Sequence, residues 1–133
     1  MRFVLDTNVL LSAFFTRGVC EALLDACILD DTHTIFVCEH ILSEFSRHAR
    51  TKFRTPDPEV QLALAYLRRH TQIVEPAPIP EDSFRDAQDL PILGAAVAAR
   101  ADVLVTGDAD LLTLTSYQSI PILSPRTIFD RLL

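Results

Sequence analysis

The sequence predicts an α/β protein of three layers, in which helices cover both faces of a central parallel sheet. Two observations carry this prediction. The candidate strands are almost wholly apolar, and they alternate along the chain with segments of helical periodicity. Strands that are buried on both faces lack the polar side of a half-exposed strand. The 133 residues contain no internal repeat and no linker, so they predict a single domain over residues 1–133.

The first half of the chain is predicted to contain two strands and four helices. Residues 2–5 and 34–38 are short apolar runs that predict the strands. Apolar residues at helical spacing predict helices that begin at Asn8 and at Glu21, run from Glu39 to about Arg50, and extend from Glu59 to His70. Gly18 and the Asp30–Thr32 turn separate the first three of these segments.

The second half is predicted to contain three strands, at residues 72–75, 102–106 and 120–123. Three prolines make residues 76–80 an extended surface loop. Ser83 with Asp86 fits a capping box for a short helical turn. An alanine-rich helix is expected over residues 90–100, and Pro125 is expected to start the last helix.

Composition excludes several classes of protein. Apolar residues make up 49% of the chain, which argues against disorder. The three cysteines form no C-x-x-C pair, so free thiols packed in the core are expected rather than a zinc site. No apolar stretch approaches the ~20 residues that span a bilayer, and no targeting signal is recognisable. A cytoplasmic protein with no membrane contact is expected.

Four acidic residues follow or adjoin the predicted strands. Asp6 comes directly after the first strand, and Asp108 lies two residues after the 102–106 strand. Functional groups in open parallel sheets gather beyond the C-terminal ends of the strands, so these carboxylates converge if the two strands are neighbours. Glu44 lies in the helix after the second strand and leans toward its N-terminus. Asp89 stands at the start of the helix that leads to the Asp108 strand.

Carboxylates that share a site repel one another unless a cation neutralises them. Ligation by oxygen alone suits Mg²⁺ or Mn²⁺, and no His or Cys stands at these four positions to favour zinc. A divalent ion with bound water steadies the charge of a phosphodiester transition state. The four acids therefore predict a metal-dependent nuclease.

Each acid also has a purely structural interpretation. Asp6 or Asn8 is a candidate cap for the first helix, and Asp89 for the helix over residues 90–100. Asp108 with Asp110 would suit an ordinary turn, and Glu44 an exposed helix face. Taken singly, none of these motifs is specific; their joint occurrence is what favours the site.

Four segments, in this order, resemble the motifs of PIN-domain nucleases. Residues 4–13 (Val-Leu-Asp-Thr-Asn-Val-Leu-Leu-Ser-Ala) resemble the opening motif, and 104–112 (Leu-Val-Thr-Gly-Asp-Ala-Asp-Leu-Leu) the motif with the fourth acid. Residues 41–45 (Ile-Leu-Ser-Glu-Phe) match the glutamate segment, and 85–96 resemble the segment with the third acid. The first and last motifs are fairly specific, and the glutamate segment is weak alone.

The resemblance implies a PIN-like fold with Asp6, Glu44, Asp89 and Asp108 as catalytic metal ligands. It further implies that Asp110 assists from behind these ligands or at a second metal. Asp86 would cap a helix or ligate through water. Three polar residues would position the acids or the water at the metal: Thr7, Asn8 and Thr106. Chains of this length are often similar to VapC-type ribonucleases, the toxins of toxin–antitoxin pairs. An RNA substrate, a cognate antitoxin and a homodimer are therefore expected.

The net charge of −6 is unusual for a protein that binds nucleic acid. A bound cation would offset part of this charge, and basic residues cluster after the Glu44 helix. Arg47, Arg50, Lys52 and Arg54 are predicted to contact phosphates beside the site, whereas Arg68 and Arg69 are interpreted as a solvated helix face.

Three other functions compete with this interpretation. A phosphotransferase of the haloacid dehalogenase type needs a second Asp two residues after the first, but position 8 is Asn. A receiver domain needs a late Lys, and the only lysine is Lys52. A catalytically silent PIN-like module for RNA or protein binding remains the alternative, and metal binding would separate it from the enzyme.

Overall fold

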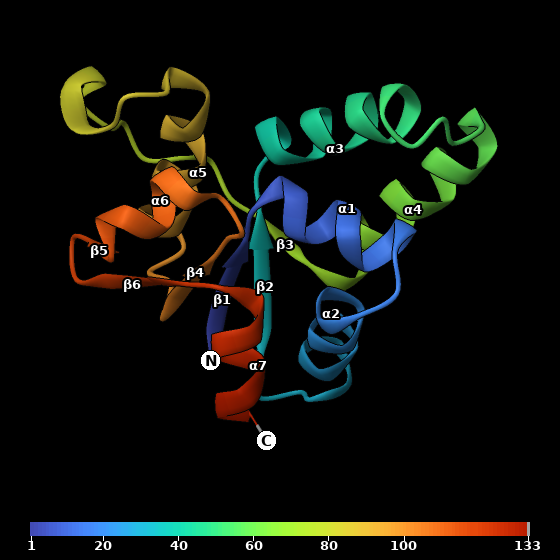
Figure 1. Ribbon diagram of the computed structural model, residues 1–133, viewed down its shortest axis with the longest axis horizontal. Coiled ribbons are helices and arrows are strands. Elements are labelled where there is room, and N and C mark those ends of the chain that lie inside the picture. The colour runs from blue at the N-terminus through green and yellow to red at the C-terminus, as the bar shows by residue number, and fades with distance from the viewer. Residues whose placement is uncertain (133) are drawn as a thin grey trace.

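The computed structural model describes residues 1–132 and contains a six-stranded sheet in the order β3-β2-β1-β4-β6-β5 (Figure 1). The strands are β1 (Arg2–Leu5), β2 (Thr34–Val37), β3 (Gln72–Ile73), β4 (Val103–Val105), β5 (Ser116–Tyr117) and β6 (Ile120–Leu123). All neighbouring strands are parallel except β5, which pairs antiparallel with β6. The predicted α/β architecture with a central parallel sheet is confirmed.

The two strands that precede the acidic residues are neighbours at the centre of the sheet. β1 pairs with β4, and Leu5 lies opposite Val105. The pairing continues past both strands, because the backbone N–H of Asp6 donates to the carbonyl of Val105 over 2.9 Å. From β1 the chain builds the sheet first toward β3 and later toward β5, so the order reverses at the β1–β4 junction. Ligands of open α/β sheets bind at such a reversal.

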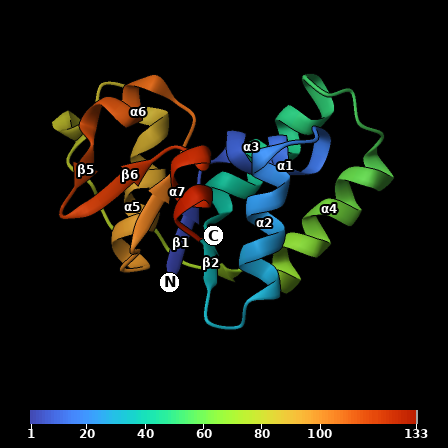
Figure 2. The same ribbon diagram turned by 60° about the horizontal axis from the view of Figure 1, so that its bottom comes forward.

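Helices cover both faces of this sheet. They are α1 (Thr7–Phe15), α2 (Val19–Leu29), α3 (Glu39–Thr51), α4 (Asp57–His70), α5 (Leu90–Ala98), α6 (Ala109–Leu114) and α7 (Pro125–Leu132). Figure 2 shows α2 and α5 on opposite sides of β1 and β2. The helix α2 also packs against α1 and α7, and α3 packs against α1 and α4. No helix within residues 1–132 is long and apolar enough to cross a membrane.

One local prediction was wrong, and two elements were not predicted. Ser83 does not cap a helical turn, because it is the last residue of the 3-10 turn η1 (Glu81–Ser83). Asp86 instead caps the next turn, η2 (Ala87–Asp89), by accepting from the N–H of Gln88. The helix α6 and the short strand β5 were not predicted, although both follow the acidic segment after β4.

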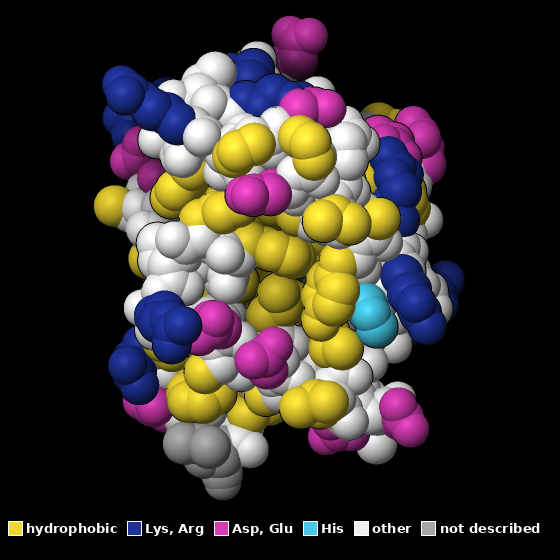
Figure 3. All heavy atoms as spheres, turned by 90° about the vertical axis from the view of Figure 1, so that its right-hand side faces the viewer, with side chains coloured by type: hydrophobic (Ala, Val, Ile, Leu, Met, Phe, Trp, Pro, Cys, Tyr) yellow, Lys and Arg dark blue, Asp and Glu magenta, His cyan; other side chains and the backbone are white. Residues whose placement is uncertain are grey.

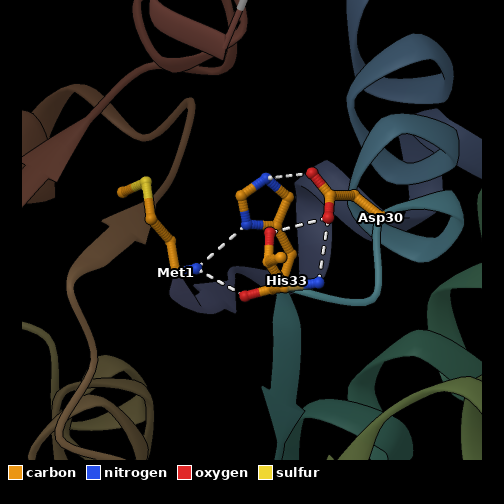
Figure 4. Close-up of polar contacts among 4 residues, drawn as sticks. Met1, Asp30 and His33 are labelled. Carbon is orange, nitrogen blue, oxygen red and sulfur yellow. Dashed lines mark hydrogen bonds and ion pairs between the residues drawn. The ribbon is translucent and has the colours of Figure 1, made fainter.

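The loop between α2 and β2 is joined to the start of β1 by polar contacts (Figure 4). The amine of Met1 donates to the carbonyl of Thr32 over 2.9 Å and lies 3.0 Å from Nδ1 of His33. Nε2 of His33 lies 3.4 Å from a carboxylate oxygen of Asp30. These contacts lie at the edge of the sheet opposite the ends of β1 and β4 that carry Asp6 and Asp108.

The proline-rich loop at residues 76–80 packs directly on α5, and Gly94 allows the close approach. The N–H of Ala77 donates to the carbonyl of Gly94 over 3.0 Å. A Cβ at position 94 would overlap the carbonyl oxygen of Ala77 and lie 3.0 Å from Cβ of Pro76. The obstacle is backbone rather than a flexible side chain, so the loop could not yield without losing this hydrogen bond.

We therefore expect Gly94→Ala to lower the free energy of unfolding by roughly 1–3 kcal/mol, as overpacking does, despite the better helix propensity of alanine. Urea denaturation measures the change. Gly107→Ala is the control, because a Cβ there meets nothing within 4 Å. Equal stability of the two variants would contradict the close packing of the loop on α5.

Candidate active site

An acidic pocket of about 240 Å³ lies where the C-terminal ends of β1 and β4 meet. Its lining comes from segments that are far apart in the sequence: Asp6, Thr7, Asn8, Glu44, His48, Asp86, Asp89, Ile92 and Asp108. All four predicted metal ligands are among these residues. The structure thus brings them to one mouth, at the position where α/β sheets bind ligands.

Asp6 lies deepest in the pocket and is held at both carboxylate oxygens. It is only 4% exposed. The hydroxyl of Thr106 donates to Oδ2 over 2.7 Å, and the N–H of Thr7 donates to Oδ1 over 2.7 Å. Thr106 is itself fully buried, and its hydroxyl oxygen accepts from the N–H of Asp108 over 3.0 Å. One buried hydroxyl therefore connects the acids that follow β1 and β4.

Glu44 reaches the pocket from α3. The hydroxyl of Thr7 donates to Oε1 of Glu44 over 2.9 Å, so α1 and α3 are joined beside Asp6. Nε2 of His40 lies 3.3 Å from the same oxygen. That nitrogen is buried and has no hydrogen-bond partner within the described chain. The two side chains are therefore close to each other, but their geometry is not that of a hydrogen bond.

Asp89 and Asp86 enter the pocket from the η2 turn before α5. Asp89 is half-buried and makes no side-chain capping bond to α5, so the capping interpretation is not realised. Asp86 is exposed, and its carboxylate caps η2. Sequence reasoning left Asp86 between a capping and a ligand role; the cap is present, and the residue also lines the pocket.

Asp108 and Asp110 take different positions. Asp108 caps α6 by accepting from the N–H of Asp110 over 3.2 Å, and it lines the pocket. The side chain of Asp110 is exposed and pairs with Arg85 over 2.7 Å. Asp110 is absent from the pocket lining. The Arg85–Asp110 pair ties the segment that carries Asp86 and Asp89 to the start of α6.

The acids disfavour one another's charged form. Burial raises the pKa of Asp6 most, and the carboxylates of Glu44 and Asp108 add to this effect against the hydrogen bonds from Thr106 and Thr7. Burial, followed by the charges of Asp6 and its neighbours, raises the pKa of Asp89 to about 7. A cation bound near Asp6 and Asp89 would offset these effects, because an opposite charge favours the ionised form of a carboxylate.

This raised pKa predicts how metal-free stability depends on pH. Folded Asp89 binds a proton up to about pH 7, whereas the unfolded side chain releases it near 3.8. The stability that comes from protonated Asp89 is therefore present below about pH 4 and is lost as pH rises to about 7. We expect Asp89→Asn to gain stability over the parent protein at pH 8 relative to pH 5.

Thermal unfolding in a chelator at the two pH values measures this difference. Asp25→Asn, an exposed substitution on α2, is the control for the loss of an aspartate. If Asp89→Asn and the parent protein keep the same stability difference at both pH values, the raised pKa of Asp89 is refuted.

The donor set fits a hard cation with a partial hydration shell. As the side chains lie, residues 1–132 contain no group of three or more His, Cys, Asp or Glu close enough together to hold an ion. Mg²⁺ in proteins usually keeps several waters and binds through one or two carboxylates. Direct ligation by all four acids would need movement of the side chains, whereas a water shell between ion and protein would not.

Of the predicted phosphate contacts, Arg50 is already engaged. It pairs with Asp57 over 2.6 Å and also contacts Ser46, so it joins α3 to α4. Arg47 and Lys52 are exposed and take part in no ion pair among the described residues. Arg47 precedes His48 in α3, and Lys52, the C-cap of that helix, follows it by four residues. Because His48 lines the pocket, both basic residues lie near its edge.

Sequence reasoning missed His48 and Ile92. His48 follows Glu44 by four residues in α3, and residues at this spacing lie on the same helix face. That spacing was the available signal. Ile92 follows Asp89 by three residues in α5 and supplies an apolar wall.

Cys27 and Cys38 are buried and Cys20 is partly buried, all as free thiols, as predicted.

The fold and pocket define an α/β protein with an acidic site at the reversal point of a parallel sheet. Residues 2–110 match the family model described as PIN domain. The chain therefore belongs to the PIN-domain family. No curated protein matches the sequence.

Among solved structures, the chain is similar to the crystal structure of VapBC2 from Rickettsia felis bound to a DNA fragment from their promoter. The TM-score is 0.66 over 93% of this chain and 98% of that chain, with 15% sequence identity. At this identity the likeness establishes the fold, which is VapC-like.

Proposed function

We propose that this protein is a metal-dependent endoribonuclease that hydrolyses phosphodiester bonds of RNA. The observation that carries the proposal is the convergence of Asp6, Glu44, Asp89 and Asp108 in one pocket at the ends of β1 and β4. Membership of the PIN-domain family supports it. These four carboxylates are the proposed ligands of Mg²⁺ or Mn²⁺, and a divalent ion bound there would stabilise the charge that develops on the phosphodiester.

The residues around the acids have distinct proposed roles. Thr106 fixes the orientation of Asp6, and Thr7 fixes that of Glu44, through the hydrogen bonds described above. The amide of Asn8, which is exposed at the pocket, is available to donate to a phosphate oxygen. Ile92 limits water on one side. Hydrogen bonds of this kind hold acids in place before substrate arrives.

Incubation of the purified protein with mixed single-stranded RNAs tests the proposal. Cleavage with Mg²⁺ or Mn²⁺, its loss with a chelator, and its loss in Asp6→Asn/Asp108→Asn are the expected results. A catalytically silent module would leave the RNA intact under all conditions. Cleavage that survives the double substitution would also refute the proposal, because it would come from another site or a contaminant.

Arg47 and Lys52 are the proposed phosphate contacts, whereas Arg50 is assigned to the α3–α4 junction. We expect Arg47→Glu/Lys52→Glu to weaken RNA binding and to flatten its dependence on salt by about one unit of log–log slope per lost contact. Fluorescence anisotropy over a salt series measures this slope. Arg69→Glu on α4 is the matched control. An unchanged slope in the double variant would remove both residues from the RNA-binding surface.

We further propose that the protein is the toxin of a toxin–antitoxin pair and forms a homodimer. The likeness to VapBC2 supports this proposal. Figure 3 supports it as well, because the face over α2 and α4 has a hollowed apolar strip bordered by charged side chains. Leu62 on α4 is 71% exposed and Leu29 on α2 is 83% exposed. Exposed apolar surface of this kind marks a contact with another chain.

A further inference from the structure

A second and larger pocket lies beside the acidic one and contains none of the predicted site residues. Its volume is about 470 Å³, within the range of small-molecule sites. Three segments line it: the start of α3, the proline-rich loop, and the η2–α5 junction. The lining residues are Glu39 and His40, Glu75 to Ala77 with Ile79, and Ala87, Leu90 and Pro91.

The two pockets share a wall. Asp86, Asp89 and Ile92 of the η2–α5 segment line the acidic pocket, whereas Ala87, Leu90 and Pro91 of the same segment line the second one. The start of α3 is divided in the same way. His40 lines the second pocket, and its Nε2 lies 3.3 Å from Oε1 of Glu44, which lines the acidic pocket. The two pockets are therefore adjacent, and both are lined by α3 and by the η2–α5 segment.

The lining combines apolar faces with hydrogen-bond acceptors. Proline, alanine, isoleucine and leucine side chains supply the faces, and two carboxylates supply the acceptors. The imidazole of His40 also lines the pocket, but its Nε2 lies toward Glu44, 3.3 Å from Oε1. Glu39 is engaged by Arg68, which donates to both carboxylate oxygens over 2.9 and 3.0 Å. Glu75 is exposed and takes part in no ion pair or side-chain hydrogen bond among the described residues. Its oxygens are free to accept from a ligand.

This combination suits an unpaired nucleobase. Single-stranded RNA is read by stacking splayed bases on flat side chains, most often aromatic rings or Arg, and by hydrogen bonds to the base edge. In this pocket the apolar faces of Pro76, Leu90 and Pro91 would take the place of the aromatic rings. A carboxylate accepts from an exocyclic amino group, as at N4 of cytosine, but has no donor for the O4 carbonyl of uracil. The second pocket would therefore favour a base with an amino group.

We propose that the second pocket binds an unpaired RNA base that carries an exocyclic amino group, next to the phosphodiester in the acidic pocket. Glu75 is the residue that selects the base. The inference rests on the proposed RNA substrate, and it goes beyond that proposal by assigning a base preference to residues outside the acidic cluster. The test must distinguish binding of an RNA base from binding of a peptide or of a second copy of this chain in the same pocket.

The test measures binding and cleavage separately. Short fluorescent homopolymers of adenosine, cytidine and uridine are bound to the full chain in chelator, where cleavage is excluded, and anisotropy gives the affinities. Cytidine or adenosine RNA is expected to bind about tenfold or more tightly than uridine RNA, as expected for one good base contact. Glu75→Gln should reduce this preference to about twofold or less, and Glu59→Gln, an exposed substitution on α4, should not alter it.

Ala87→Trp tests the pocket by filling it. Ala87 is exposed, so the fold should tolerate the larger side chain. We expect weaker binding of all three homopolymers and unchanged Mn²⁺ affinity. Equal binding of the three homopolymers by the parent protein, or an unchanged preference in Glu75→Gln, would overturn the proposal. A change of molecular mass in Ala87→Trp with unchanged RNA affinity would also overturn it, because the pocket would then be a contact between copies.

The cleavage arm distinguishes this inference from the proposed function. A base preference in chelator without metal-dependent cleavage would retain the base pocket and refute the nuclease. Cleavage by the parent protein with no base preference in either assay would retain the nuclease and refute the base pocket.

Discussion

Replacement of Asp6 by asparagine is expected to lower the rate of metal-dependent RNA cleavage by about 10²–10³-fold, the size of effect seen when one essential electrostatic contact is removed from an active site. The asparagine side chain would keep the shape of the aspartate and one oxygen to accept from Thr106 or Thr7. What the substitution removes is the charge at the deepest point of the pocket. Initial rates on a single-stranded RNA with Mg²⁺ measure the loss.

The same substitution should leave the fold intact. Asparagine removes a charge that burial disfavours, but it leaves one of the donors Thr106 and Thr7 without its acceptor. Because these effects oppose each other, we expect thermal stability in chelator to be close to that of the parent protein. This separates loss of function from loss of structure. Asp25→Asn on α2 serves as the activity control. An Asp6→Asn protein that cleaves RNA within a few-fold of the parent rate would exclude Asp6 from catalysis.

Replacement of Phe45 by alanine is expected to lower the free energy of unfolding by about 3–5 kcal/mol, as for other buried phenylalanines. Phe45 is fully buried on α3. Its ring lies 5.4 Å from that of Phe14 in an edge-to-face contact and 5.9 Å from that of Phe15 in a stacked contact, both on α1. The side chain thus joins α3 to α1 one residue after Glu44.

Urea denaturation of Phe45→Ala measures the change. Phe53→Ala is the matched control, because Phe53 stacks on Phe15 but is 39% exposed and should cost much less. We also expect RNA cleavage to fall in Phe45→Ala at temperatures where it is folded, since the α1–α3 contact positions the bond from Thr7 to Glu44. A stability loss below about 1 kcal/mol would contradict the central role of this ring cluster.

The sheet could be predicted from sequence because its strands are buried on both faces. Short apolar runs such as residues 2–5 are stable in an α/β fold as strands of the central sheet, and the helices between them have clear periodicity. The convergence of Asp6 and Asp108 depended on β1 and β4 being neighbours, which strand order alone decides and which the sequence left conditional.

The elements that were missed are held by context rather than by local pattern. A helix of six residues such as α6 is unstable alone. It forms because Asp108 caps it, Leu111 is fully buried, and the helix packs against β6. The β5–β6 hairpin has Thr115, Gln118 and Ser119 at positive φ. None of these is the glycine or asparagine that normally marks such a turn.

Within the site, the positions of the strand ends in the sequence predicted where the acids gather, but not which residues surround them. The pairing of Arg50 with Asp57 and of Arg85 with Asp110 joins segments that no spacing rule connects. The second pocket depends on the packing of the proline-rich loop against Gly94. This contact joins segments that are well separated in the sequence, so the periodicity of either segment cannot reveal it.

Titration of the metal-free protein with Mn²⁺, followed by calorimetry near pH 8, tests the claim on which the proposed function depends. We expect saturable binding in the parent protein that is lost in Asp6→Asn and weakens as pH falls below about 7, where protonated Asp89 competes with the ion. Mn²⁺ binding that is equally tight in Asp6→Asn, or absent from the parent protein, would contradict it.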